Sequence, residues 1–100
     1  MPKLSVAVPH SLHEEEVAER LRNRFDELQE QHGHQVNDFD SQWEGNRLRC
    51  SFNTLGITVR AEVTIEPSQV TIDTELPLMA MMFKGAIERQ IRSELGQALA

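Results

Sequence analysis

Tyrosine is absent from this chain of 100 residues, and tryptophan and cysteine occur only once each. With four phenylalanines as the other aromatic residues, the chain has few side chains that could stack on nucleic-acid bases. Basic residues are also scarce, 10 against 16 acidic ones, so the net charge is −6 and a phosphate backbone would be repelled. One cysteine cannot form an intrachain disulfide, which is typical of a reducing compartment. We therefore expect a cytoplasmic protein that does not bind nucleic acid.

The chain also lacks long apolar runs. No stretch approaches the about 20 apolar residues of a membrane-spanning helix, and the opening MPKLSVAVPHS holds too few apolar residues for a signal peptide. The five glycines are scattered, so no glycine-rich loop is available to hold a phosphate. Because 100 residues is close to the usual size of one domain, residues 1–100 are expected to form a single domain without a membrane span.

Residues that could carry chemistry are few and unfavourably placed. His10 and His13 lie at the start of a predicted helix and His32 and His34 at its end. About 30 Å of helix would separate the two pairs, and neither pair alone supplies the three or four ligands of a zinc site. Cys50 alternates with apolar neighbours along a predicted strand, and a buried thiol is inert. We expect no metal, no cofactor and no enzymatic activity.

Hydrophobic periodicity, by contrast, is clear along most of the chain. Apolar residues alternate with polar ones in five stretches, most cleanly in ITVRAEVTI, which is typical of strands with one buried face. Two other stretches repeat apolar residues every three or four positions, as amphipathic helices do. The expected strands cover 3–8, 37–44, 47–52, 57–65 and 70–76, and the expected helices cover about 12–32 and from about Met79 onward. The order β-α-β-β-β-β-α predicts a two-layer α+β fold, an antiparallel sheet with two helices on one face, resembling a reduced helix-grip.

The segment ELPLMAMMFKGAIERQ gathers three of the four methionines. On an α-helix Met79, Met82 and Phe83 would share one arc, because their spacing follows the helical turn. Met81 would lie roughly 160° from Phe83 and therefore on another face. Methionine can fill an irregular corner of a core, and it also recurs at surfaces that bind varied apolar partners. We expect at least one of these side chains to be exposed beside Lys84, with Met81 the leading candidate; core packing and a homodimer contact are the alternatives.

Four segments that cover nearly the whole chain carry a family resemblance. They read KLSVAVPHSLHEEEVAERL, WEGNRLRCSF, LGITVRAEVTIE and LPLMAMMFKGAIERQIRSEL. The most distinctive parts are VPHSL and LPxxAxMFKG, and together the segments resemble the polyhydroxyalkanoic acid system proteins, a family of small bacterial proteins. The matching positions are Pro9, His10, Ser11, Trp43, Gly45, Asn46, Pro77, Met82, Phe83, Lys84 and Gly85. The resemblance implies a role at or around polyhydroxyalkanoate granules, in regulation or granule structure, and it brings no catalytic residues with it.

Three hypotheses about function follow. The first is a non-enzymatic accessory protein of polyhydroxyalkanoate storage that contacts the granule surface or granule-associated proteins. Its proposed contact surface is Met79, Met81, Met82, Phe83 and Lys84. The second is a small helix-grip module that binds an apolar ligand such as a hydroxyacyl chain, and its lining would be Trp43, Phe52, Val59 and Phe83. The third is a homodimeric scaffold.

Overall fold

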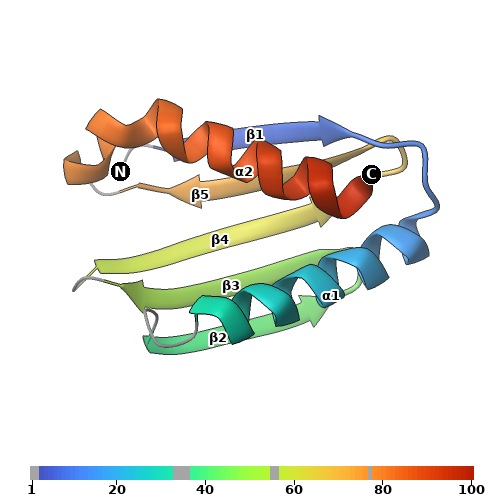
Figure 1. Cartoon of the computed structure of the whole chain (residues 1–100), viewed down its shortest axis with the longest axis horizontal. Coiled ribbons are helices and arrows are strands. Elements are labelled where there is room, and N and C mark those ends of the chain that lie inside the picture. Colours follow the sequence, from blue (N-terminus) through green and yellow to red (C-terminus); the bar gives the residue numbers. More distant parts are fainter. Residues whose placement is uncertain (1–2, 33–36, 55–56, 77) are drawn as a thin grey trace.

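The computed structural model describes residues 3–32, 37–54, 57–76 and 78–100 (Figure 1). Its elements in chain order are strand β1 (Lys3–Pro9), helix α1 (Glu14–His32), strands β2 (Asn37–Glu44), β3 (Arg47–Thr54), β4 (Ile57–Ile65) and β5 (Gln69–Glu75), the 3₁₀ helix η2 (Leu78–Phe83) and helix α2 (Lys84–Leu99). The predicted α+β class and element order are confirmed. One detail differs, since a 3₁₀ helix precedes the last α-helix.

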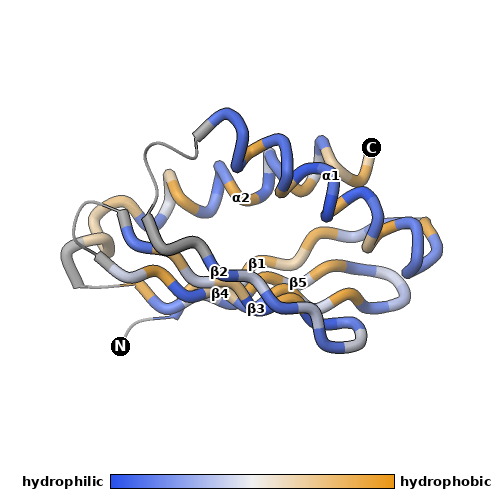
Figure 2. The backbone as a smooth tube through the Cα atoms, turned by 90° about the horizontal axis from the view of Figure 1, so that it is seen from below, coloured by the Kyte–Doolittle hydropathy of each residue, from blue (hydrophilic) through white to orange (hydrophobic). Residues whose placement is uncertain are grey.

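The five strands form one sheet in the order β1-β5-β4-β3-β2, and every neighbouring pair is antiparallel. The strands β2 to β5 follow one another across the sheet, whereas β1 pairs with β5 and forms the opposite edge from β2. Both helices cover the same face, with α2 over β1 and β5 and α1 over β2 and β3 (Figure 1). Figure 2 shows the resulting two layers edge-on. The predicted layering is therefore confirmed.

Two clusters of buried apolar side chains lie between the sheet and the helices. The members of the larger cluster are Val17, Leu21, Leu48, Val63, Ile65, Val70 and Leu95. Those of the smaller cluster, under the first half of α2, are Leu4, Val6 and Leu76. Strands send every second side chain to one face and helices every third or fourth. The periodicity of the sequence therefore places these residues between the two layers.

Two arginines hold α1 in position. Arg24 donates from Nε to Oε2 of Glu94 on α2 at 2.7 Å, and from Nη1 to Oε2 of Glu27 at 3.0 Å. The hydrogen bond to Glu94 and, to a smaller extent, the one to Glu27 raise the pKa of Arg24. Arg22 lies over the ring of Trp43, 4.8 Å from its centroid, a cation–π contact that ties α1 to the edge strand β2. Both contacts fix α1 against its neighbours.

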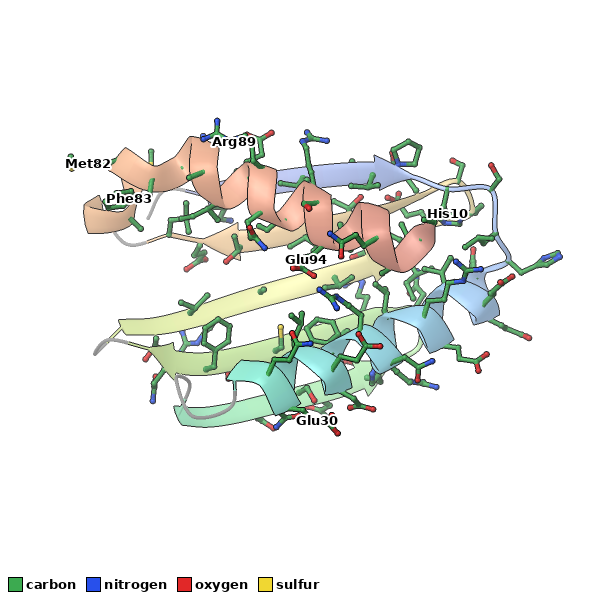
Figure 3. The ribbon with its side chains drawn as sticks, viewed as in Figure 1. His10, Glu30, Met82, Phe83, Arg89 and Glu94 are labelled. Carbon is green, nitrogen blue, oxygen red and sulfur yellow. The ribbon has the colours of Figure 1, made fainter. Side chains whose placement is uncertain are left out.

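His10 connects the end of β1 to the turn between β4 and β5 (Figure 3). Its backbone N–H donates to the carbonyl of Ser68 at 2.9 Å. Its ring Nδ1 accepts the N–H of Leu12 at 3.1 Å, and its Nε2 lies 2.9 Å from the carbonyl of Glu66. Because Nδ1 accepts, the ring proton is assigned to Nε2, which donates to Glu66. The distinctive VPHSL segment thus has a structural use.

The β2–β3 hairpin turns on Gly45 and Asn46. Gly45 has a φ of 61°, a left-handed conformation that glycine adopts without steric penalty. Asn46 donates from Nδ2 to the carbonyl of Ile65 at 2.9 Å, and its own carbonyl accepts the N–H of Ile65 at 2.9 Å. The WEGN segment therefore ties the hairpin to the end of β4.

Arg92 of α2 reaches the free edge of β1. Its Nη1 donates to the carbonyl of Ala7 at 3.2 Å, while Glu88 accepts from its Nη2 at 3.1 Å. The N–H of His10 bonds the carbonyl of Ser68 directly opposite it. The backbone groups of every second residue counted back from His10 therefore point toward β5. Ala7 lies between two such residues, so its carbonyl points outward, away from the sheet. An outward-facing carbonyl of this edge strand is thereby occupied.

Candidate contact surface

Three large apolar side chains are exposed where the last helical segment begins. Met82 is 87% exposed, Phe83 61% and Met81 37%, and no other large apolar side chain in the described parts of the chain is exposed to this degree. Figure 3 shows Met82 and Phe83 at the end of the molecule opposite His10. Lys84 follows and is also exposed. We refer to Met81, Met82, Phe83 and Lys84 as the apolar corner.

The apolar corner is exposed because the buried stripe of α2 begins after it. η2 is a 3₁₀ helix, which turns about 120° per residue instead of the about 100° of an α-helix. The arc expected for a single α-helix starting near Met79 therefore does not form. The α-helical phase starts at Lys84, and its inward-facing stripe runs from Ile87 to Leu99. Within η2, Ala80 packs against the smaller core cluster.

The exposures rank the expected contact residues differently from the sequence pattern. Met82, rather than Met81, is the most exposed side chain, and Met81 is the least exposed of the three. The α-helical phase used for that expectation is wrong at these positions, because they belong to η2. Met79 also belongs to η2, but its side chain lies outside the described part of the chain, as does Pro77.

The residues expected to line a ligand cup do not lie together. Phe52 and Val59 are half-buried and face each other across β3 and β4. Trp43 pairs with Leu48 further along the sheet and packs against the larger core cluster. Phe83 is exposed in the apolar corner, at the start of the helix that covers β1 and β5 (Figures 1 and 3). Of the four residues, only Phe52 and Val59 are neighbours. A helix-grip ligand cup formed by all four stays a prediction.

A shallow cavity of about 480 Å³ lies on the polar face of the sheet. Charged residues of both signs line it, among them Lys3, Arg49, Arg60, Glu62, Asp73 and Glu75. Arg49 approaches Glu62 at 3.7 Å, as expected for opposite charges on neighbouring strands. Because the lining carries both signs of charge, the cavity favours neither an anionic nor a cationic ligand.

In the part of the chain that the structure describes, no three histidine, cysteine or acidic side chains gather closely enough to hold a metal ion. No helix within the same residues is long and apolar enough to cross a membrane.

Cys50 is expected to be protected from alkylation in the folded protein. Its side chain is buried, its Sγ lies 3.8 Å from the carbonyl of Ala61, and burial raises the pKa of the thiol. The reactive thiolate is therefore scarce near neutral pH, and reagent cannot reach it. Iodoacetamide should modify the folded protein at least about a hundred-fold more slowly than the protein unfolded in guanidinium. Equal rates for the two samples would show that the site opens readily.

The fold and the apolar corner define a small two-layer α+β protein with large apolar side chains exposed at one end. The family model described as "Putative polyhydroxyalkanoic acid system protein" matches residues 4–99, and the chain belongs to this family. No curated protein matches the chain. Among solved structures, the chain is similar to a Thermus thermophilus protein, TTHA0849, at 12% identity and a TM-score of 0.38, with 98% of this chain and 94% of that chain covered. This likeness is too loose to bear on function.

Proposed function

We propose that this chain is a non-enzymatic accessory protein of polyhydroxyalkanoate storage, which works in the cytoplasm and contacts the granule through the apolar corner. The observation that carries the proposal is the exposure of Met82 and Phe83 in a member of this family. A polyester granule presents an apolar surface to water. A folded protein adsorbs to such a surface by moving exposed apolar side chains out of water.

Two side chains of this size are enough for reversible binding. Full burial of one methionine or phenylalanine side chain contributes about 1.5–3 kcal/mol. Met82 and Phe83 are mostly exposed before contact, so most of this free energy is available, about 2–4 kcal/mol for the pair before ordering costs. The flexible thioether of Met82 also suits an irregular polymer surface.

Among the described residues, the cysteine and the histidine of the distinctive VPHSL segment are both occupied structurally, which supports a role in binding. Cys50 is buried, and both ring nitrogens of His10 bond backbone groups. The carboxylates of the polar face are interleaved with arginines, as Glu62 is with Arg47 at 3.6 Å. The apolar corner itself offers thioethers, a phenyl ring and a solvated ammonium group, which bind surfaces but form no acid–base pair.

The test is cosedimentation of the protein with washed polyhydroxyalkanoate granules. The parent should sediment with them, and the double variant Met82→Ser, Phe83→Ser should bind at least about thirty-fold more weakly, because it lacks most of the apolar free energy. Met81→Ser should have a smaller effect, since Met81 is less exposed. Leu28→Ser, which removes a half-buried apolar side chain from α1, is the matched control and should bind like the parent.

Two results would contradict the proposal. A folded double variant that sediments as well as the parent would remove the apolar corner from the contact. A concentration-dependent mass that the double variant loses would assign the corner to a homodimer. If the chain instead binds an apolar ligand in the predicted cup, added hydroxyacyl compounds should raise its melting temperature, and longer acyl chains should raise it more.

A further inference from the structure

Two cations, Lys84 within the apolar corner and Arg89 one turn further along α2, have no acidic partner among the described residues. Lys84 directly follows Phe83 and is exposed. Arg89 folds back along α2, so that its Nη1 lies 3.8 Å from the position a Cβ on Gly85 would occupy. Figure 3 shows Arg89 at the same end of α2 as Met82. Among the described residues, neither Lys84 nor Arg89 has an acidic side chain within 4.0 Å.

Most of the other arginines, by contrast, pair with carboxylates. They are Arg20, Arg24, Arg47, Arg49 and Arg92. The nearest acid along α2, Glu88, is bonded to Arg92 at 3.1 Å, and the first turn of α2 contains no acidic residue. A protein with a net charge of −6 therefore presents free positive charge beside its most exposed apolar side chains.

We propose that the apolar corner docks on an anionic lipid surface, with Met82 and Phe83 among the acyl chains and Lys84 and Arg89 at the headgroup phosphates. The inference rests on the proposed function, because it uses the same corner; it differs in that the surface carries anionic lipid headgroups as well as apolar chains. Apolar side chains bordered by lysine and arginine are the pattern by which proteins lie at a membrane interface, since burial and attraction to anionic lipids add together. The long stems of both cations allow their charges to stay at headgroup level while the corner inserts.

The size of the corner favours a fluid surface over a protein partner. A stable protein interface buries about 800 Å² on each side and about 20 residues, whereas the corner offers three exposed apolar side chains. Met82, 87% exposed, projects from the molecule instead of lining a groove. A projecting side chain can enter a lipid layer without a preformed pocket on the other side.

The test is sedimentation with vesicles of phosphatidylcholine alone and of phosphatidylcholine mixed with phosphatidylglycerol, beside lipid-free polyester particles. The parent should bind the anionic vesicles more strongly than the neutral ones, and high salt should reduce the difference, because it shortens the range of the attraction. The variant Lys84→Ser, Arg89→Ser should bind anionic vesicles about thirty-fold more weakly, at roughly 1 kcal/mol for each cation. The matched control Lys3→Ser, Arg60→Ser removes the same charge from the polar face of the sheet and should bind like the parent.

The outcomes separate this inference from the proposed function. Equal binding to neutral and anionic vesicles, or undiminished binding by the Lys84, Arg89 variant, overturns the anionic-lipid inference, even if polyester particles still retain the parent. Retention by anionic vesicles without retention by granules or polyester supports the inference and removes the proposed function. Self-association that depends on Lys84 and Arg89, with no vesicle binding, identifies a second copy of the chain as the occupant and also overturns it.

Discussion

The variant Leu48→Ala is expected to lose about 3 kcal/mol of its free energy of unfolding. Leu48 is 1% exposed and belongs to the larger core cluster, opposite Val63 on β4 and Trp43 on β2. Truncation removes buried methyl groups and leaves a cavity, and such changes cost about 2–5 kcal/mol. A domain of this size has about 5–15 kcal/mol in total, so the variant should be clearly less stable yet still folded.

Guanidinium unfolding followed by the fluorescence of Trp43, the single tryptophan, would measure this loss. Leu48→Met keeps the volume and the apolar character of the side chain, and it should cost less than about 1.5 kcal/mol. If alanine and methionine were equally harmless, the core around Leu48 would be more loosely packed than its burial indicates. Granule binding by Leu48→Ala should be unchanged below its unfolding transition, because the apolar corner is not part of this cluster.

The variant His10→Ala is expected to lose about 2 kcal/mol of its free energy of unfolding. The imidazole satisfies the N–H of Leu12 and the carbonyl of Glu66, and partly buried groups that lose their partner cost about 1–3 kcal/mol. The end of β1 and the start of α1 should loosen together, because both are held by the same ring. Differential scanning calorimetry and hydrogen exchange at Leu12 would detect the change.

His13→Ala is the matched control for this variant. His13 lies three residues further on and is exposed, so its removal should change stability by no more than about 0.5 kcal/mol. If His10→Ala were as stable as the parent but failed to bind granules, the VPHSL segment would have a functional use in place of the structural one described above. Loss of stability with normal binding is the expected combination.

The sheet could be predicted from the sequence because its signal is local. Val63 and Ile65 alternate with polar residues along β4 and are both buried, and the stripe of Val17 and Leu21 places α1 on the core. Each of these patterns needs only the side-chain period of a strand or a helix. Element order then followed from the order of the patterns, and the α+β class from the number of helices and strands.

The contacts that fix the layers could not be predicted, because their partners are far apart in sequence. His10 and Glu66 are separated by 56 positions, and Arg24 and Glu94 by 70. No periodicity marks such pairs. Many exposed arginines and glutamates could have formed them equally well.

The exposure of the methionine-rich segment was predicted in part. The excess of methionine indicated exposed side chains in this segment, but which of them are exposed depends on whether the backbone is α-helical or 3₁₀. The periodicity of the sequence does not show that this segment is 3₁₀, nor that Ala80 is the residue of η2 that packs against the core. Met82 consequently takes the place expected for Met81.

If many copies of the protein share one granule surface, as the proposed function requires, the hydrogen bond from Arg92 to the carbonyl of Ala7 bears on whether their edge strands pair. An edge strand with free outward-facing carbonyls is a template on which a strand of another molecule can add. At this edge the guanidinium occupies such a carbonyl, and at the opposite edge β2 carries exposed Asp40 and Glu44, whose like charges disfavour pairing with a second β2. Molecules held side by side in such a layer should therefore stay separate, because pairing through either edge strand is disfavoured.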